Sequence, residues 1–140
     1  MKNKSIIYTF IALGFIITSI VLVVFANREP TSLISELNMQ NKKTGDVTIS
    51  VLPIRTGTKF DFEIQLNTHS TELVYKLDEL ASLKSDNGET LRPVAWEGDA
   101  PGGHHRTGKL LFPNFESAPK NIFLSIYNIE NTNLEFNWNL

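Results

Sequence analysis

A run of 21 residues, from Ile6 to Ala26, contains no charged residue and no proline. A helix of about 20 apolar residues, rising about 1.5 Å per residue, crosses the hydrocarbon core of a bilayer. We therefore predict one transmembrane helix at residues 6–26. This feature constrains the chain most, because removing residues 1–26 from the 140 residues leaves 114 for a single domain with a modest core.

The charges around this run predict its orientation. Lys2 and Lys4 precede it, whereas only Arg28 follows closely, next to Glu29. By the positive-inside rule, residues 1–5 stay in the cytoplasm and the rest of the chain lies on the far side of the membrane.

The alternative is a signal peptide that is cleaved after Ala26, since Val24 and Ala26 offer small residues at the positions a signal peptidase reads. Such peptides usually have an apolar region of about 7–15 residues, which is shorter than this run. We therefore expect an uncleaved signal anchor in the cell membrane, with secretion as the alternative.

Composition excludes several classes of protein. The chain has no cysteine, which excludes a disulfide framework, a cysteine zinc site and a cysteine nucleophile. Its formal net charge is −2, from 13 Lys+Arg and 15 Asp+Glu. Without a basic excess to neutralise phosphates, we do not expect a nucleic-acid partner.

Residues 27–44 are mostly polar and are predicted to be a linker, with an apolar patch at residues 33–39 that suits either a short helix or an edge strand. From residue 45 to 140 the apolar residues recur mainly with a period of two, as expected for half-buried strands. The predicted strands cover residues 47–52 (ended by Pro53), 60–67, 73–77, 81–84, 90–96, 107–112, 121–128 and 134–140.

These short strands are separated by turn signals such as Asp86-Asn87-Gly88, and no helix-length pattern interrupts them. We therefore predict an all-β domain at 45–140: an immunoglobulin-like or fibronectin-like β-sandwich of seven to eight strands, preceded by the transmembrane helix.

All three histidines fall in two short segments. His69 follows one predicted strand, and His104 and His105 precede another. If these segments share one rim of the sandwich, the imidazoles meet there. Imidazole and carboxylate groups bind Zn(II) and Cu(II), so we predict a metal site from His69, His104 or His105, and two nearby acids, Glu97 and Asp99.

The alternative role for these residues is structural. Gly102 and Gly103 allow close approach of the backbone, so a hydrogen bond from His104 or His105 would lock the turn. In this interpretation Arg106 pairs with a neighbouring carboxylate, Glu97 or Asp99. No cofactor would then be bound.

Trp96 stands next to the glycine-rich loop and is the candidate aromatic platform for a carbohydrate. Together with Arg106, it is also the candidate contact for a partner protein of the cell envelope. Catalysis is not expected, because Ser70, His69 and Asp99 can be combined on paper but no nucleophile-elbow motif supports them.

The Leu66-Asn-Thr-His-Ser70 segment and the Gly102-Gly-His-His-Arg-Thr-Gly-Lys-Leu-Leu-Phe112 segment carry a resemblance over about residues 58–140. With Pro93-Val-Ala-Trp-Glu-Gly98, they resemble a group of uncharacterised exported or membrane-anchored prokaryotic β-sandwich domains. The resemblance implies no activity. This chain departs from the pattern at Tyr75-Lys76, where an acidic residue is expected.

The sequence thus predicts a membrane-anchored binding or assembly module outside the cytoplasm that is not an enzyme. The first alternative is Zn(II) or Cu(II) binding through the histidines, and the second is binding of a carbohydrate or another cell-surface ligand. Close approach of the ring nitrogens of His69 to those of His104 and His105 would favour the metal site.

Overall fold

The computed structural model of the chain describes residues 37–140. The predicted transmembrane helix at 6–26 and most of the predicted linker lie outside these residues. Within them, no helix is long and apolar enough to cross a bilayer. The elements are β1 (Gln40–Thr44), β2 (Val47–Thr56), β3 (Lys59–Asn67), α2 (Leu77–Leu80), β4 (Ala81–Ser85), β5 (Thr90–Leu91), β6 (Ala95–Gly98), β7 (His105–Leu111), β8 (Asn121–Ile129) and β9 (Thr132–Asn139).

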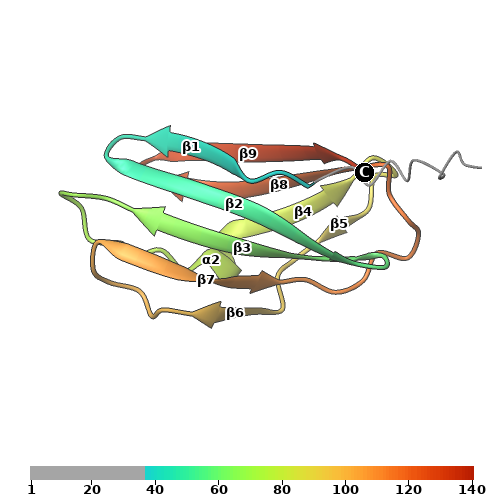
Figure 1. Cartoon of the computed structure of the whole chain (residues 1–140), viewed down its shortest axis with the longest axis horizontal. Helices are drawn as coiled ribbons and strands as arrows, with labels where there is room; N and C mark the ends of the chain where they lie inside the picture. The colour runs from blue at the N-terminus through green and yellow to red at the C-terminus, as the bar shows by residue number, and fades with distance from the viewer. Residues whose placement is uncertain (1–36) are drawn as a thin grey trace, which may run out of the picture. The chain divides into compact units, whose positions relative to one another are not determined.

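The strands form two antiparallel sheets (Figure 1). One has the order β1-β2-β3-β7-β6 and the other β5-β4-β8-β9. Residues of both sheets belong to one hydrophobic core. The predicted all-β class is therefore confirmed, and the two packed sheets are consistent with a β-sandwich.

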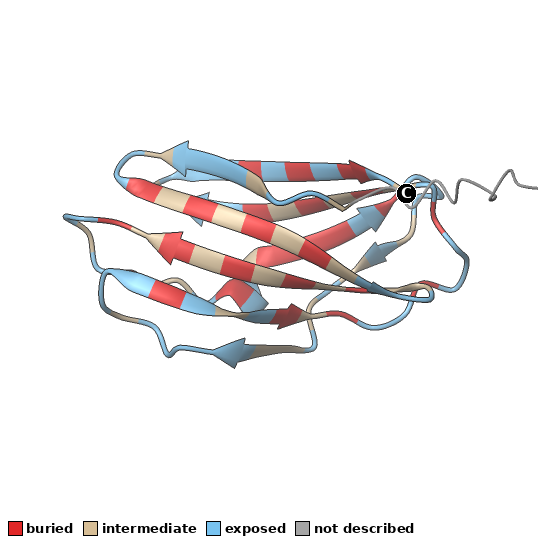
Figure 2. Cartoon of the chain, in the orientation of Figure 1, coloured by how far each residue is buried: buried red, intermediate tan, exposed pale blue. Residues whose placement is uncertain are grey.

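Alternate residues of each long strand enter the core, because successive side chains of a strand point to opposite faces (Figure 2). Phe62 of β3 lies centrally among the aromatic residues. Its ring centroid is 5.7 Å from that of Phe112 and 5.5 Å from that of Trp138. Trp138 belongs to the other sheet, so this contact joins the two layers. Burying each such side chain contributes about 1.5–3 kcal/mol.

The strands predicted at 81–84, 107–112, 121–128 and 134–140 are confirmed, with ends that differ by no more than two residues. The prediction that the second strand ends at Pro53 is wrong. β2 continues through Pro53, which pairs with Phe62. β1 begins opposite Val51, so Pro53 lies where β2 has a single neighbour. A strand tolerates proline where the missing N–H needs no partner.

Residues 40–44, which we predicted as the end of the linker, form the edge strand β1. This strand pairs with β2 as far as Thr44 opposite Val47. Gly45 and Asp46 make a two-residue turn, and Gly45 has φ +53°, which glycine adopts without steric cost. β1 has no buried residue, so no hydrophobic alternation marked it in the sequence.

The strand predicted at 73–77 is wrong. The chain there has no regular structure and leads into the single turn α2. Leu73 and Leu77 are nevertheless fully buried, as their apolar character predicts. The main chain of Leu73 bonds to a loop instead of a strand: its N–H donates to Gly103 O at 2.9 Å, and its carbonyl accepts from Gly102 N at 2.8 Å.

The strand predicted at 90–96 is also wrong as a single element. It divides into β5 and β6, which belong to different sheets. Arg92, Pro93 and Val94 form the crossing between them. Proline has no N–H to donate to a strand ladder, so the pairing breaks here and the chain changes layer.

Substitution of Gly108 tests how closely β7 packs against β6, the strand that follows this crossing. It lies opposite Gly98, and a Cβ at position 108 would be 2.5 Å from Trp96 Cζ2 and 2.8 Å from Glu97 O. We predict that Gly108→Ala lowers the free energy of unfolding by about 1–3 kcal/mol, because the indole ring and β6 must move. Urea denaturation of the detergent-solubilised chain, followed by tryptophan fluorescence, measures this.

The control is Thr107→Ala, at the exposed neighbouring position. It should change the free energy of unfolding by no more than about 0.5 kcal/mol. Equal small effects of the two substitutions would contradict the close approach of β6 and β7.

Candidate functional site

The two histidine segments lie at the same end of the sandwich. The N–H of Thr68 donates to His104 O at 2.9 Å, and Asn67 of β3 is opposite His105 of β7. His69, next to Thr68, therefore shares a rim with the glycine-rich loop. All three histidines are exposed.

Two of the imidazoles bond to the neighbouring segment. His104 Nδ1 is 3.2 Å from Thr71 O, and His105 Nδ1 is 2.7 Å from Asn67 Oδ1. A carbonyl oxygen can only accept, so His104 Nδ1 carries the proton in its bond. His69 makes no hydrogen bond to any residue within 37–140. These contacts support the role in which His104 and His105 fix the turn.

The predicted metal ligands do not form a cluster. Asp99 Oδ2 accepts a hydrogen bond from Thr107 N at 2.8 Å, and Glu97 lies on β6 opposite Lys109. In the part of the chain that the structure describes, no three His, Cys, Asp or Glu side chains are placed to hold a metal ion. The Zn(II) or Cu(II) site stays a prediction.

Arg106 is a buried side chain, with 2 % of its surface exposed. Nη1 donates to Tyr75 O at 2.6 Å and to Leu73 O at 3.2 Å, and Nη2 donates to Asp99 O at 3.1 Å. The predicted ion pair with the carboxylate of Glu97 or Asp99 is wrong, since Arg106 reaches only the main chain of Asp99. No ion pair among residues 37–140 involves Arg106.

This arrangement gives Arg106 a structural role. Its guanidinium joins the irregular segment around Leu73 to the loop that starts at Asp99. Burial lowers the pKa of the Arg106 guanidinium, and the negative charges of Asp99 and Asp78 partly oppose that shift. The group stays charged, because the ordinary pKa of arginine lies far above neutrality.

Trp96 packs beside Arg106 and the loop that starts at Asp99. Its Nε1–H donates to Asp99 O at 2.9 Å, and the Arg106 guanidinium carbon is 5.5 Å from its ring centroid. The ring also lies against Gly108, where a side chain would collide with it. Trp96 is half-buried, so it is a packed residue more than an open platform.

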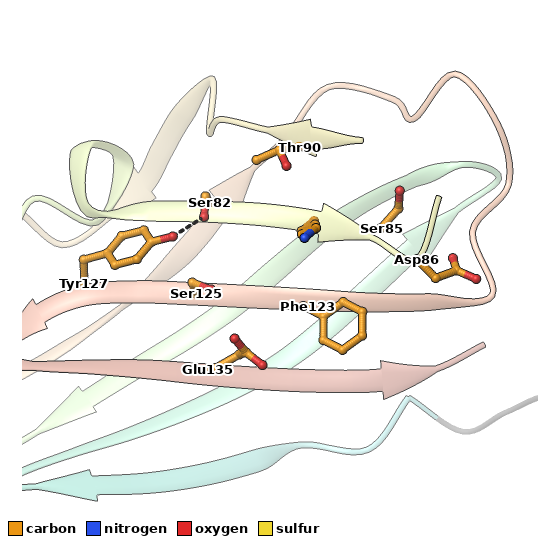
Figure 3. A pocket seen from close by; sticks show the side chains of 9 residues that line it. Ser82, Ser85, Asp86, Thr90, Phe123, Ser125, Tyr127 and Glu135 are labelled. Carbon is orange, nitrogen blue, oxygen red and sulfur yellow. Dashed lines mark hydrogen bonds between the residues drawn. The ribbon is translucent and has the colours of Figure 1, made fainter. Parts of the chain in front are cut away.

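A second candidate site lies elsewhere, on the outer face of the four-stranded sheet. A groove of about 590 Å³ opens there (Figure 3). This volume falls in the range of about 300–1,000 Å³ that is typical of small-molecule sites. The groove is lined by Ser82, Lys84, Ser85, Asp86, Thr90, Phe123, Ser125, Tyr127 and Glu135.

Strand pairing places these side chains in rows across the groove. Ser125 of β8 lies between Ser82 of β4 and Glu135 of β9. On β8, Phe123 and Tyr127 stand on either side of Ser125 (Figure 3). The hydroxyl groups of Tyr127 and Ser82 are 2.8 Å apart and share a hydrogen bond.

We did not predict this groove from the sequence, although a signal exists. Phe123, Ser125 and Tyr127 alternate with the buried residues of β8, so the pattern places two aromatic rings on the solvent side. Aromatic residues usually occupy the buried face of a strand, so two of them on the solvent face indicate a candidate binding surface. The rest of the lining comes from β4, β5, β9 and Asp86 in the turn after β4, and the pairing of strands brings these residues together.

Asp86 fixes one end of the groove. Its Oδ1 accepts hydrogen bonds from Lys120 N at 3.0 Å and Asn121 N at 3.2 Å. Desolvation alone would raise the pKa of Asp86, but these backbone hydrogen bonds outweigh it and lower the pKa below its ordinary value.

Comparisons with protein-family models, with curated proteins and with solved structures return no match for this chain. The resemblance to exported prokaryotic β-sandwich domains therefore stays a prediction.

Replacement of Arg106 tests its structural role. We predict that Arg106→Met lowers the free energy of unfolding by about 2–4 kcal/mol, because Tyr75 O and its neighbours lose a charged donor. Arg106→Lys is the matched control. It keeps the positive charge but can reach at most some of these carbonyl groups, so its free energy of unfolding should lie between those of the unsubstituted chain and Arg106→Met. Hydrogen exchange of the Leu73 and Gly102 amides should accelerate in Arg106→Met, and unchanged exchange would contradict the role.

The pH dependence of stability tests Asp86. Its folded-state pKa lies below the ordinary value of 3.8, so ionised Asp86 stabilises the fold above that pH. The contribution is lost as the pH falls through the folded-state pKa. We therefore expect Asp86→Asn to lower the melting temperature at pH 7, and the difference from the unsubstituted chain to shrink below pH 3.8. Thermal unfolding followed by circular dichroism from pH 7 to pH 3 measures this, with the exposed Glu116→Gln as control. A difference that stays constant with pH would contradict the prediction.

Proposed function

We propose that this chain is a binding module of the cell envelope. In this proposal residues 6–26 anchor it in the membrane, the sandwich lies outside the cytoplasm, and the groove on β4, β8 and β9 binds a polar ligand. The groove is the observation that supports binding there, because its volume falls in the range of small-molecule sites and its lining carries several hydroxyl groups.

The anchor and the location rest on the sequence. The uncharged run at 6–26 is long enough to span a bilayer, and Lys2 and Lys4 precede it. We also propose that the sandwich is an immunoglobulin-like or fibronectin-like module, which its two antiparallel sheets support. Such modules commonly serve in binding at cell surfaces.

The lining favours binding over catalysis. Among its nine residues there is no histidine and no cysteine. The side chain of Ser82 is hydrogen-bonded to the Tyr127 hydroxyl and not to a histidine or a carboxylate, so no general base within the described residues is hydrogen-bonded to Ser82.

The absence of cysteine from the chain allows a direct test in cells. Ser125→Cys places one thiol in the groove, and Thr107→Cys places one on the exposed face of β7. Each variant is treated with a membrane-impermeant maleimide in intact cells and again as purified chain. Both thiols should react in intact cells, because the sandwich lies outside the cytoplasm.

The ratio of the two labelling rates tests the groove. A bound ligand slows labelling of Ser125→Cys in cells relative to Thr107→Cys, by about tenfold if the free ligand stands at ten times its Kd. Purification removes the ligand and restores the ratio. Labelling of both thiols only after lysis would contradict the location, and an identical ratio in cells and after purification would contradict binding in the groove.

A further inference from the structure

We infer that the ligand of this groove is a carbohydrate chain of uncharged sugars, lying along β8 between Phe123 and Tyr127. This inference rests on the proposed function and names the class of ligand. Four features of the groove carry it: the spacing of its aromatic rings, its unpaired polar groups, its balance of charge and its amino-acid composition.

The two rings are spaced for an extended ligand. Phe123 and Tyr127 lie four residues apart on the same strand, which corresponds to about 13 Å. Phe123 is half-buried and Tyr127 is 37 % exposed, so each presents part of an apolar ring to solvent. A sugar ring has apolar C–H faces that stack on aromatic rings, and a chain of several sugars would reach from one ring to the other.

Polar groups between the rings are available to a ligand. The side chains of Ser125, Thr90 and Lys84 make no hydrogen bond or ion pair within residues 37–140, and neither does Glu135. The Tyr127 and Ser82 hydroxyl groups bond to each other but keep further capacity to accept. A hydroxyl both donates and accepts, so hydroxyl side chains match the hydroxyls of a sugar.

The charges in the groove oppose a highly charged ligand. Lys84 is the single cation of the lining, whereas Asp86 and Glu135 are acidic. Oδ1 of Asp86 already accepts hydrogen bonds from two backbone N–H groups, so part of this carboxylate is used by the fold. A polyanion such as a nucleic acid or a phosphate-rich polymer would meet two carboxylates, and electrostatic repulsion disfavours it.

The composition also disfavours a protein partner. Serine is depleted at protein interfaces, and serine and threonine contribute little to interface hot spots. Phe123 and Tyr127 are of types that interfaces also favour, but the groove contains three serines and one threonine and lacks tryptophan, methionine and arginine. A sugar chain therefore fits the lining better than a folded protein does.

The test uses the full chain in lipid nanodiscs and isothermal titration calorimetry. The probes are four uncharged linear oligosaccharides (cellohexaose, maltohexaose, mannohexaose and fully N-acetylated chitohexaose) and one anionic one, a galacturonic acid hexamer. We expect at least one uncharged probe to bind with a Kd between about 10 µM and 1 mM, and the anionic probe to bind at least tenfold more weakly.

Substitutions locate the binding. Phe123→Leu keeps the apolar volume but removes the flat ring, and it should weaken binding about tenfold. Tyr127→Phe keeps the ring and removes one hydroxyl, so the loss should be about three- to fivefold. Trp96→Phe, the aromatic control outside the groove, should leave the affinity unchanged. Near-ultraviolet circular dichroism confirms that each variant is folded.

Three results would overturn the inference: no binding of any uncharged probe at about 10 mM, binding that Phe123→Leu leaves unchanged, or tighter binding of the anionic probe. Failure of the oligosaccharides with continued shielding of Ser125→Cys in cells would reject the carbohydrate and leave the groove as a site for another ligand. Loss of that shielding rejects the proposed function itself, so the two failures are distinguishable.

Discussion

Packing of the inner faces of the two sheets is the constraint on which the rest of the structure depends. Phe62 of β3 contacts Phe112 in its own layer and Trp138 of β9 in the opposite layer. Because successive residues of a strand point to opposite faces, this burial also decides what the outer faces carry. On β8 the inward residues Ile122, Leu124 and Ile126 leave the aromatic and hydroxyl side chains of the groove facing solvent. The proposed binding surface is thus a direct consequence of how the core is filled.

A buried cation completes the sandwich where regular pairing stops. The segment around Leu73 and Tyr75 has no strand partner, and its carbonyl groups are instead hydrogen-bonded to Arg106. Burial of a guanidinium is costly unless its donors are satisfied, and each of its terminal nitrogens donates to at least one carbonyl. Its Nε–H has no partner within the described residues. The charge therefore orders a part of the chain that hydrophobic packing alone does not align.

The two surfaces described above differ in how their polar groups are bonded. At the end of the sandwich that carries His69, His104 and His105, hydrogen bonds join the glycine-rich loop to the segment after β3, such as that from His104 to Thr71 O. The groove has the opposite character, since several of its polar groups bond to nothing in residues 37–140. Polar groups already paired with the protein hold structure together, whereas unpaired ones at a concave surface are free to bind a ligand. This contrast is why the proposal rests on the groove.

The sequence by itself determined the all-β class, most strand positions and the core residues, because these follow from an alternation that is local and has a period of two. It also carries the candidate membrane helix, which lies outside the described residues. Other features needed the tertiary structure. β1 has no buried side chain, and the main chain of Leu73 bonds to a loop far along the chain, so neither leaves a local pattern. The partners of Arg106 and the walls of the groove likewise come from separate strands. Such contacts depend on which strands become neighbours, and only long-range pairing in the folded chain decides that.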